Sequence, residues 1–224
     1  MRLEPAKIVL VTGVASGVGK TALSRRVAAL VEASGRTVEL FDETDILERK
    51  EFSEVIASFR STGVASIRQL LDASNRYVMT SVAGDVDVFV QDMLFPFLPS
   101  LLAWGHSDEE IISFFAALAE CCEAVELLQV HVTGDAAESL QRAVGREGQG
   151  WLESLITKVA TYADTIEDVD DVDSLILYLE SAERRSQRLL ASAPWPVVIV
   201  DGATGTEDTA VQAIAALKLL DPAS

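Results

Sequence analysis

The stretch KIVLVTGVASGVGKTALSRRVAALVEA, residues 7–33, decides the fold of this chain. Its first six residues, 7–12, form an apolar run that predicts a buried strand. Over 20–33, apolar residues recur every three or four positions, which predicts a helix with one buried face. The turn between them holds three glycines, which let backbone N–H groups converge on an anion at the positive end of the helix. The stretch therefore predicts a phosphate-binding loop.

The end of this loop carries the side chains expected to act on a nucleotide. Lys20 is placed to reach the β- and γ-phosphates, and the Thr21 hydroxyl is placed to bind Mg²⁺. The strict phosphate-loop motif has a glycine five residues before the position of Gly19, where this chain has Val14. The first glycine of this chain, Gly13, comes one position earlier. We expect a loop with an altered conformation at Val14 that still binds a nucleotide. The predicted nucleotide-binding residues are Gly13, Ser16, Gly17, Val18, Gly19, Lys20 and Thr21.

The rest of the chain alternates apolar strands with amphipathic helices. Five short strands separated by helices predict an α/β fold with three αβα layers, in which helices cover both faces of one parallel sheet. We expect a single domain over 1–224, with a helical insertion at 93–124 and a candidate lid at 134–163. After the first strand and helix, strands are predicted at 37–41, 86–91, 126–132 and 197–200, and helices at 50–60, 64–82, from about 107, and at 136–146, 151–162, 172–191 and 206–220.

Composition narrows the class of partner. The chain has 224 residues and a net charge of −17, so its surface repels nucleic-acid backbones. The two cysteines, Cys121 and Cys122, are adjacent and cannot build a disulfide framework, which favours a reducing cytoplasm. The sequence has no apolar run long enough to cross a membrane. We expect a cytoplasmic protein that binds a small-molecule acceptor and binds neither nucleic acid nor a membrane. A homodimer is possible.

The loop GVASGVGKT, residues 13–21, resembles the phosphate loops of small P-loop kinases. It looks like those of 2-phosphoglycerate kinase and, more loosely, of adenylate-kinase-like enzymes, and it shares its spacing with dethiobiotin synthetase. The resemblance covers about the first 45 residues. It implies ATP and Mg²⁺ as cofactors, the P-loop fold, and transfer of the γ-phosphate to a small molecule, with Lys20 as a catalytic residue.

Acidic residues follow the second and third predicted strands, at the edge of the sheet where ligands bind. In the kinases that the loop resembles, an acid after the second strand accepts a proton from the substrate hydroxyl, and an acid after the third holds Mg²⁺. By this resemblance Asp42 is the catalytic base and Asp92 the metal ligand beside Thr21. Asp42 could instead cap a turn, and which of Asp42, Glu43 and Asp45 faces the substrate stays open.

Two arginines follow the fourth predicted strand, where P-loop kinases carry a lid. Arg142 and Arg146 lie four residues apart, so they share one helix face. The resemblance implies that they stabilise the transferring phosphoryl group, because charge neutralisation is the main contribution to catalysis in such enzymes. The alternative is a pair of solvated arginines that contact nearby glutamates.

Candidate acceptor-binding residues occupy the middle of the chain. Arg60 and Arg68 lie where nucleotide kinases bind the phosphate of the acceptor, although both could be surface ion-pair residues. Phe95, Phe97 and Trp104 could line an apolar acceptor pocket, or they could pack in the core.

These residues favour an ATP-dependent phosphotransferase acting on a hydroxyl of a small metabolite, nucleoside or antibiotic-like compound. A nucleotide kinase is the alternative if Arg60 and Arg68 bind an acceptor phosphate. A ligase resembling dethiobiotin synthetase is disfavoured, because the lysine usual after its second strand is missing from FDETDIL, residues 41–47. A nucleotide-switch protein is the alternative that is not an enzyme, but the sequence lacks the Asn-Lys-x-Asp guanine motif.

Overall fold

The structure, a computed structural model, describes residues 5–92, 96–162 and 169–219. Its strands form one parallel sheet in the order β2-β3-β1-β4-β5. The strands are β1 (Ala6–Thr12), β2 (Val38–Phe41), β3 (Val88–Asp92), β4 (Val125–Thr133) and β5 (Val197–Asp201). The first strand therefore lies at the centre of the sheet, and the phosphate loop leaves its carboxyl end.

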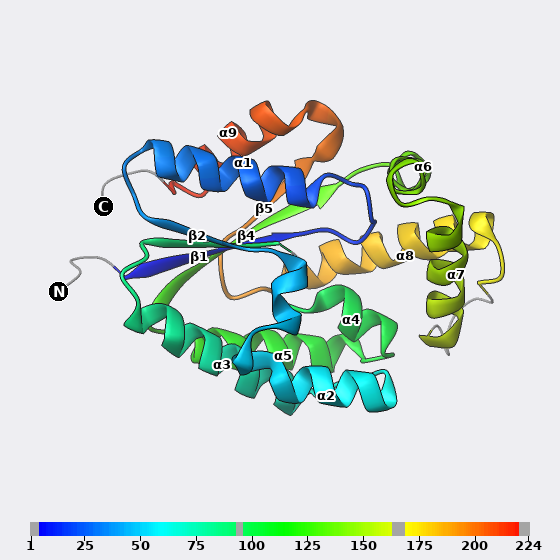
Figure 1. The fold of residues 1–224 in the computed structure, drawn as a ribbon, viewed down its shortest axis with the longest axis horizontal. Coiled ribbons are helices and arrows are strands. Elements are labelled where there is room, and N and C mark those ends of the chain that lie inside the picture. The colour runs from blue at the N-terminus through cyan, green and yellow to red at the C-terminus, as the bar shows by residue number, and fades with distance from the viewer. Residues whose placement is uncertain (1–4, 93–95, 163–168, 220–224) are drawn as a thin grey trace.

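Helices cover both faces of this sheet (Figure 1). One face carries α1 and α9, and the opposite face carries α3 and α5. The helices are α1 (Lys20–Ala33), α2 (Ser53–Thr62), α3 (Ile67–Ala83), α4 (Leu98–Ala103), α5 (Asp108–Cys121), α6 (Ala136–Glu147), α7 (Gln149–Tyr162), α8 (Val172–Leu190) and α9 (Thr206–Ala216). The predicted three-layer αβα fold is confirmed.

The central strand explains why the sheet needs cover on both sides. Successive side chains of a strand point to opposite faces. On β1, Ile8 and Leu10 enter the core under α3 and α5, whereas Val9 and Val11 enter the core under α1 and α9. All four side chains are fully buried. The continuous apolar run of β1 therefore contributes alternate side chains to two separate cores.

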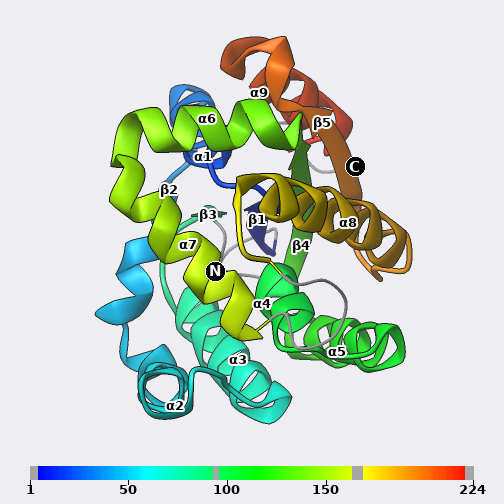
Figure 2. The same cartoon turned by 90° about the vertical axis from the view of Figure 1, so that its right-hand side faces the viewer.

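A third apolar cluster joins α6, α7 and α8 (Figure 2). Helix α8 belongs to two clusters at once. Its first half places Leu175 and Leu179 in this third cluster, and its second half places Leu189 and Leu190 in the core under α3 and α5. Helix α8 therefore connects the α6–α7 region to the body of the sheet.

Two local features differ from the sequence prediction. The last helix ends at Ala216 and not at 220, because the chain turns at Lys218 (φ 49°) and Leu219 folds back to bury its side chain completely. A short helix, α4, also forms in the proline-rich segment, since Pro99 occupies its first turn, where no N–H is needed. The division into an insertion at 93–124 and a lid at 134–163 stays a prediction.

Candidate active site

The phosphate loop connects β1 to α1, and its glycines are required by its geometry. Gly17 and Gly19 have φ angles of 83° and 111°, which side chains disfavour. Neighbouring segments also press on the loop. A Cβ atom on Gly17 would lie 2.1 Å from the carbonyl oxygen of Ser139 on α6, and one on Gly13 would lie 2.5 Å from that of Val132 on β4. The glycine-rich turn is therefore held between β4 and α6.

Lys20 and Thr21 begin α1 directly after the loop. The Lys20 side chain is buried, and its Nζ donates a hydrogen bond of 2.7 Å to the carbonyl oxygen of Ala15. The lysine thus folds back over the loop, above the space that phosphates would take. The predicted roles of Gly13, Ser16, Gly17, Val18 and Gly19 in nucleotide binding rest on this loop and stay predictions.

The structure brings together the two residues predicted to hold the metal. The Thr21 hydroxyl donates to Oδ2 of Asp92 at 2.5 Å, although the two residues are 71 positions apart. Asp92 ends β3 and is 2% exposed. A hydroxyl and one carboxylate fit Mg²⁺, which binds hard oxygen atoms and keeps waters and substrate phosphates as its other ligands. Among the described residues no group of three or more His, Cys, Asp or Glu forms a metal cage.

The two arginines of α6 have different surroundings. Arg142 lies on the phosphate loop, because its Nε donates to the carbonyl oxygen of Gly17 at 3.1 Å and its guanidinium also contacts Ser139 Oγ at 3.0 Å. Arg146 is 64% exposed and contacts Glu147 beside it. Of the two predicted lid arginines, only Arg142 contacts the loop in this conformation.

The acids that follow β2 contact each other. Oδ2 of Asp45 accepts the backbone N–H of Asp42 at 2.9 Å, which closes a turn of 3-10 helix. Oδ2 of Asp42 also contacts Arg25 of α1 at 3.1 Å. Asp42 is therefore a cap and an ion-pair partner in this structure, and its role as a base stays a prediction. The side chain of Glu43 lies outside the described residues.

The predicted acceptor-binding residues have different surroundings. Arg60 and Arg68 are exposed on α2 and α3, and Arg68 reaches only Asp72, at 3.9 Å. Trp104 is partly buried against Phe59, with 6.5 Å between ring centroids. Phe97 is buried and contacts Phe114, also within the core. Phe95 lies outside the described residues.

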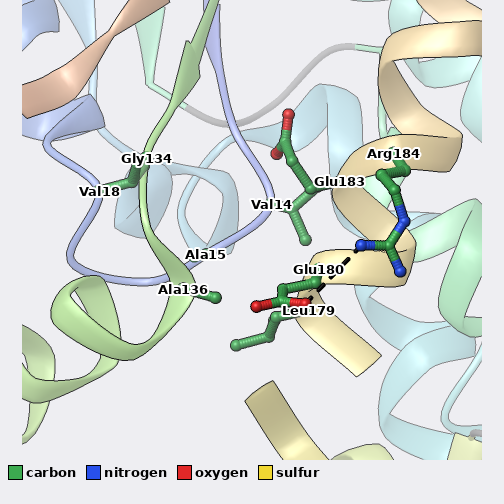
Figure 3. A pocket seen from close by; sticks show the side chains of 9 residues that line it. All are labelled: Val14, Ala15, Val18, Gly134, Ala136, Leu179, Glu180, Glu183 and Arg184. Atoms are coloured by element: carbon green, nitrogen blue, oxygen red, sulfur yellow. Dashed lines mark ion pairs between the residues drawn. The ribbon is translucent and has the colours of Figure 1, made fainter. Parts of the chain in front are cut away.

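A pocket of about 190 Å³ opens beside the start of the phosphate loop (Figure 3). Helix α8 supplies one wall with Glu180, Glu183 and Arg184, and Arg184 forms an ion pair of 3.7 Å with Glu180. The sequence analysis missed all three residues. Their spacing is that of any solvated helix face, and only the packing of α8 against the loop distinguishes them. The other lining residues are Val14, Ala15, Val18, Gly134, Ala136 and Leu179.

The parallel sheet, with a glycine-rich loop between β1 and α1, is the three-layer α/β arrangement that the sequence predicts. No protein-family model matches the sequence, and no curated protein matches it. A deoxyadenosine kinase from M. mycoides, solved with the product dCMP and a flexible dCDP, is similar over 95% of this chain and 99% of its own, with 13% identity and a TM-score of 0.47. The crystal structure of APE1195 is similar over 86% and 97%, with 16% identity and a TM-score of 0.40.

No helix in the described part of the chain combines the length and the apolarity that a membrane crossing requires.

Proposed function

We propose that this protein is an ATP- and Mg²⁺-dependent phosphotransferase that acts on a hydroxyl group of a small molecule. The observation that carries the proposal is the contact between Thr21 and Asp92, at 2.5 Å, directly after a glycine loop that folds Lys20 over itself. Lys20 and Thr21 are the first two residues of α1, and the buried carboxylate of Asp92 contacts the Thr21 hydroxyl there. This set suits a metal-bound triphosphate.

Each residue of the site then has a task. The loop backbone and the N-terminus of α1 bind the phosphates, and Lys20 neutralises their charge. Thr21 and Asp92 hold the metal. Arg142 lies close enough to the loop to contact a phosphate once its bond to the Gly17 carbonyl opens. ATP supplies the phosphoryl group, and Asp42 orients the acceptor hydroxyl and takes its proton.

The acceptor in this proposal carries no phosphate of its own. Arg60 and Arg68, the arginines that a nucleotide kinase would need for an acceptor phosphate, are exposed, and Arg68 is 91% exposed. The acceptor is a nucleoside, an antibiotic-like compound or another small alcohol. A nucleoside monophosphate, a carboxylate substrate and a nucleotide switch without an acceptor are the competing outcomes of the test.

The test is a transfer assay. The purified chain is incubated with labelled ATP and Mg²⁺, together with pools of nucleosides and other alcohols, pools of nucleoside monophosphates, or pools of carboxylates. We expect a labelled product only from the first set and none from Lys20→Ala, which keeps its fold by circular dichroism. Slow ATP hydrolysis with no labelled acceptor would indicate a switch, and turnover near wild type in Lys20→Ala would overturn the proposal.

The base assignment has its own variant, Asp42→Asn. Asparagine caps turns about as well as aspartate does, so the fold should persist. Loss of the base should lower kcat by roughly 10²–10⁴-fold and leave Mg²⁺·ATP affinity unchanged. If kcat holds in Asp42→Asn but falls in Asp45→Asn, the base is Asp45. If it holds in both, Asp42 serves only as the cap and the partner of Arg25.

A further inference from the structure

Val14 occupies the position where the strict phosphate-loop pattern has glycine, and its side chain has a defined place. It packs against the apolar cluster of α6, α7 and α8, which includes Ala136, Leu140 and Leu179. It also lines the pocket beside the loop, next to Glu183 (Figure 3). A glycine at this position would leave the loop with no side chain in that cluster. The departure from the pattern therefore creates a contact between the loop and α8.

Glu183, on the same helix, lies beside Val14 in this pocket (Figure 3). Its carboxylate accepts a hydrogen bond from His131 Nε2 at 2.8 Å and one from Gln187 Nε2 at 2.9 Å. Burial is the largest influence on the pKa of Glu183 and raises it, but these hydrogen bonds and the neighbouring His131 and Val14 backbone together lower the pKa below its ordinary value. Glu183 is therefore an ionised carboxylate whose fixed acceptors face the loop.

His131 ties this carboxylate to the centre of the sheet. The indole N–H of Trp195 donates to Gln129, and the amide of Gln129 donates to the Thr12 hydroxyl, each at 2.8 Å. That hydroxyl lies 3.1 Å from Nδ1 of His131. Because the carboxylate of Glu183 can only accept, Nε2 of His131 carries the hydrogen, and Nδ1 then accepts from Thr12. A chain of four donors thus ends at Glu183.

We propose that Val14 and Glu183 form a joint through which α8 positions the first half of the phosphate loop. Ala15, the next residue, accepts the hydrogen bond from Lys20 Nζ. The joint therefore positions the backbone at Ala15, which binds Lys20. Lys20 is the residue proposed to contact the γ-phosphate. Val14 and Glu183 are positioning residues. The inference rests on the proposed nucleotide site and adds that helix α8 positions the phosphate loop of that site.

The test uses the full chain and two nucleotides. ADP needs the second half of the loop, from Ser16 to Thr21, whereas a non-hydrolysable ATP analogue also needs the segment that the joint positions. For Glu183→Gln we expect analogue affinity and kcat to fall about tenfold each, with ADP affinity within about twofold of wild type. Asp173→Asn is the matched control, because it makes the same acid-to-amide change at an exposed position of α8. It should leave both affinities and kcat unchanged.

A double-mutant cycle separates the joint from a general loss of stability. Val14→Gly removes the side-chain anchor and keeps the N–H, and we expect it to reproduce the selective loss. If the two residues act together, the double variant Val14→Gly/Glu183→Gln should be little worse than either single variant. Multiplying effects would overturn the joint, as would equal losses of ADP and analogue affinity or a lowered melting temperature with unchanged affinities and kcat.

The two proposals fail in different ways. A wild-type chain that binds ADP and the analogue but transfers no phosphate to any acceptor contradicts the phosphotransferase, while the joint is still judged by the two affinities. A wild-type chain that binds neither nucleotide overturns both proposals.

Discussion

At the scale of single residues, Gly17 and Gly19 show how differently two glycines of one loop are constrained. Both have positive φ angles, so an alanine at either position costs roughly 1–2 kcal/mol in backbone strain. Only Gly17 also has a neighbour in the way, since its Cβ would lie 2.1 Å from the carbonyl oxygen of Ser139, whereas Gly19 faces open space.

Gly17→Ala should therefore destabilise the protein more than Gly19→Ala. We expect a loss of about 1–2 kcal/mol for Gly19→Ala and a clearly larger loss for Gly17→Ala, because α6 must also move away from the loop. Urea unfolding of both variants measures the difference. Equal losses would mean that α6 does not press on the loop in solution.

Asp92 is the residue on which the metal assignment depends. Asp92→Asn keeps the size of the side chain and removes its charge, so the Mg²⁺ concentration needed for half-maximal transfer should rise by roughly tenfold or more. A titration of activity with Mg²⁺ checks this. Loss of turnover at saturating Mg²⁺, together with a shifted metal dependence in Asp42→Asn, would exchange the roles assigned to the two acids.

At the scale of elements, local capping sets the starts of α5 and α3. The helix predicted from about 107 begins at Asp108, whereas the helix predicted from 64 begins only at Ile67. Ser107 and Glu110 form a capping box at α5: Ser107 Oγ accepts the Glu110 N–H at 3.2 Å, and Glu110 Oε2 accepts the Ser107 N–H at 2.9 Å. Ser66 and Gln69 form a second box at α3.

Ser107→Ala should lower the free energy of unfolding by about 1 kcal/mol, because one backbone N–H of α5 loses its acceptor. Ser66→Ala is a parallel test at a helix on the same face of the sheet and should cost a similar amount. Chemical denaturation of the two variants measures both effects. An unchanged stability in Ser107→Ala would show that water replaces the cap at no cost.

At the scale of the whole molecule, Glu183 links stability to pH. Its pKa is lower than the ordinary 4.5. A carboxyl group of this kind stabilises the folded state above its unfolded pKa, and this contribution is lost as the pH falls through the folded value. The titratable and charged groups around it are His131 on β4, and Glu180 and Arg184 on α8.

The difference in unfolding free energy between wild type and Glu183→Gln should therefore be largest above the ordinary pKa of 4.5 and shrink as the pH falls below it. Urea unfolding at a series of pH values gives this difference directly, and comparison with the variant removes the effect of the other carboxylates. A difference that stays constant over the range would mean that the folded state does not lower the pKa of Glu183.

Sequence reasoning reached the strands, most helix boundaries and the phosphate loop, since each depends on residues close together in the chain. The resemblance of the loop to those of small kinases also paired Thr21 with Asp92, and the two side chains are in contact. Sequence reasoning missed Glu183 and Arg184, whose helix looks solvated in sequence. It also gave Arg142 and Arg146 the same role, although only Arg142 contacts the loop in this structure.

By itself, then, the sequence determined a parallel α/β fold with a glycine loop at a helix N-terminus, because periodicity, capping and turn chemistry act over a few residues. Tertiary structure alone decided which distant segments press on that loop. The carbonyl oxygen of Gly17 accepts a hydrogen bond from Arg142, 125 positions away. Val14 lies beside Glu183 because α8 packs into two apolar clusters. Such contacts depend on how the helices bury their apolar faces against each other. Local sequence patterns do not show which helices will pack together.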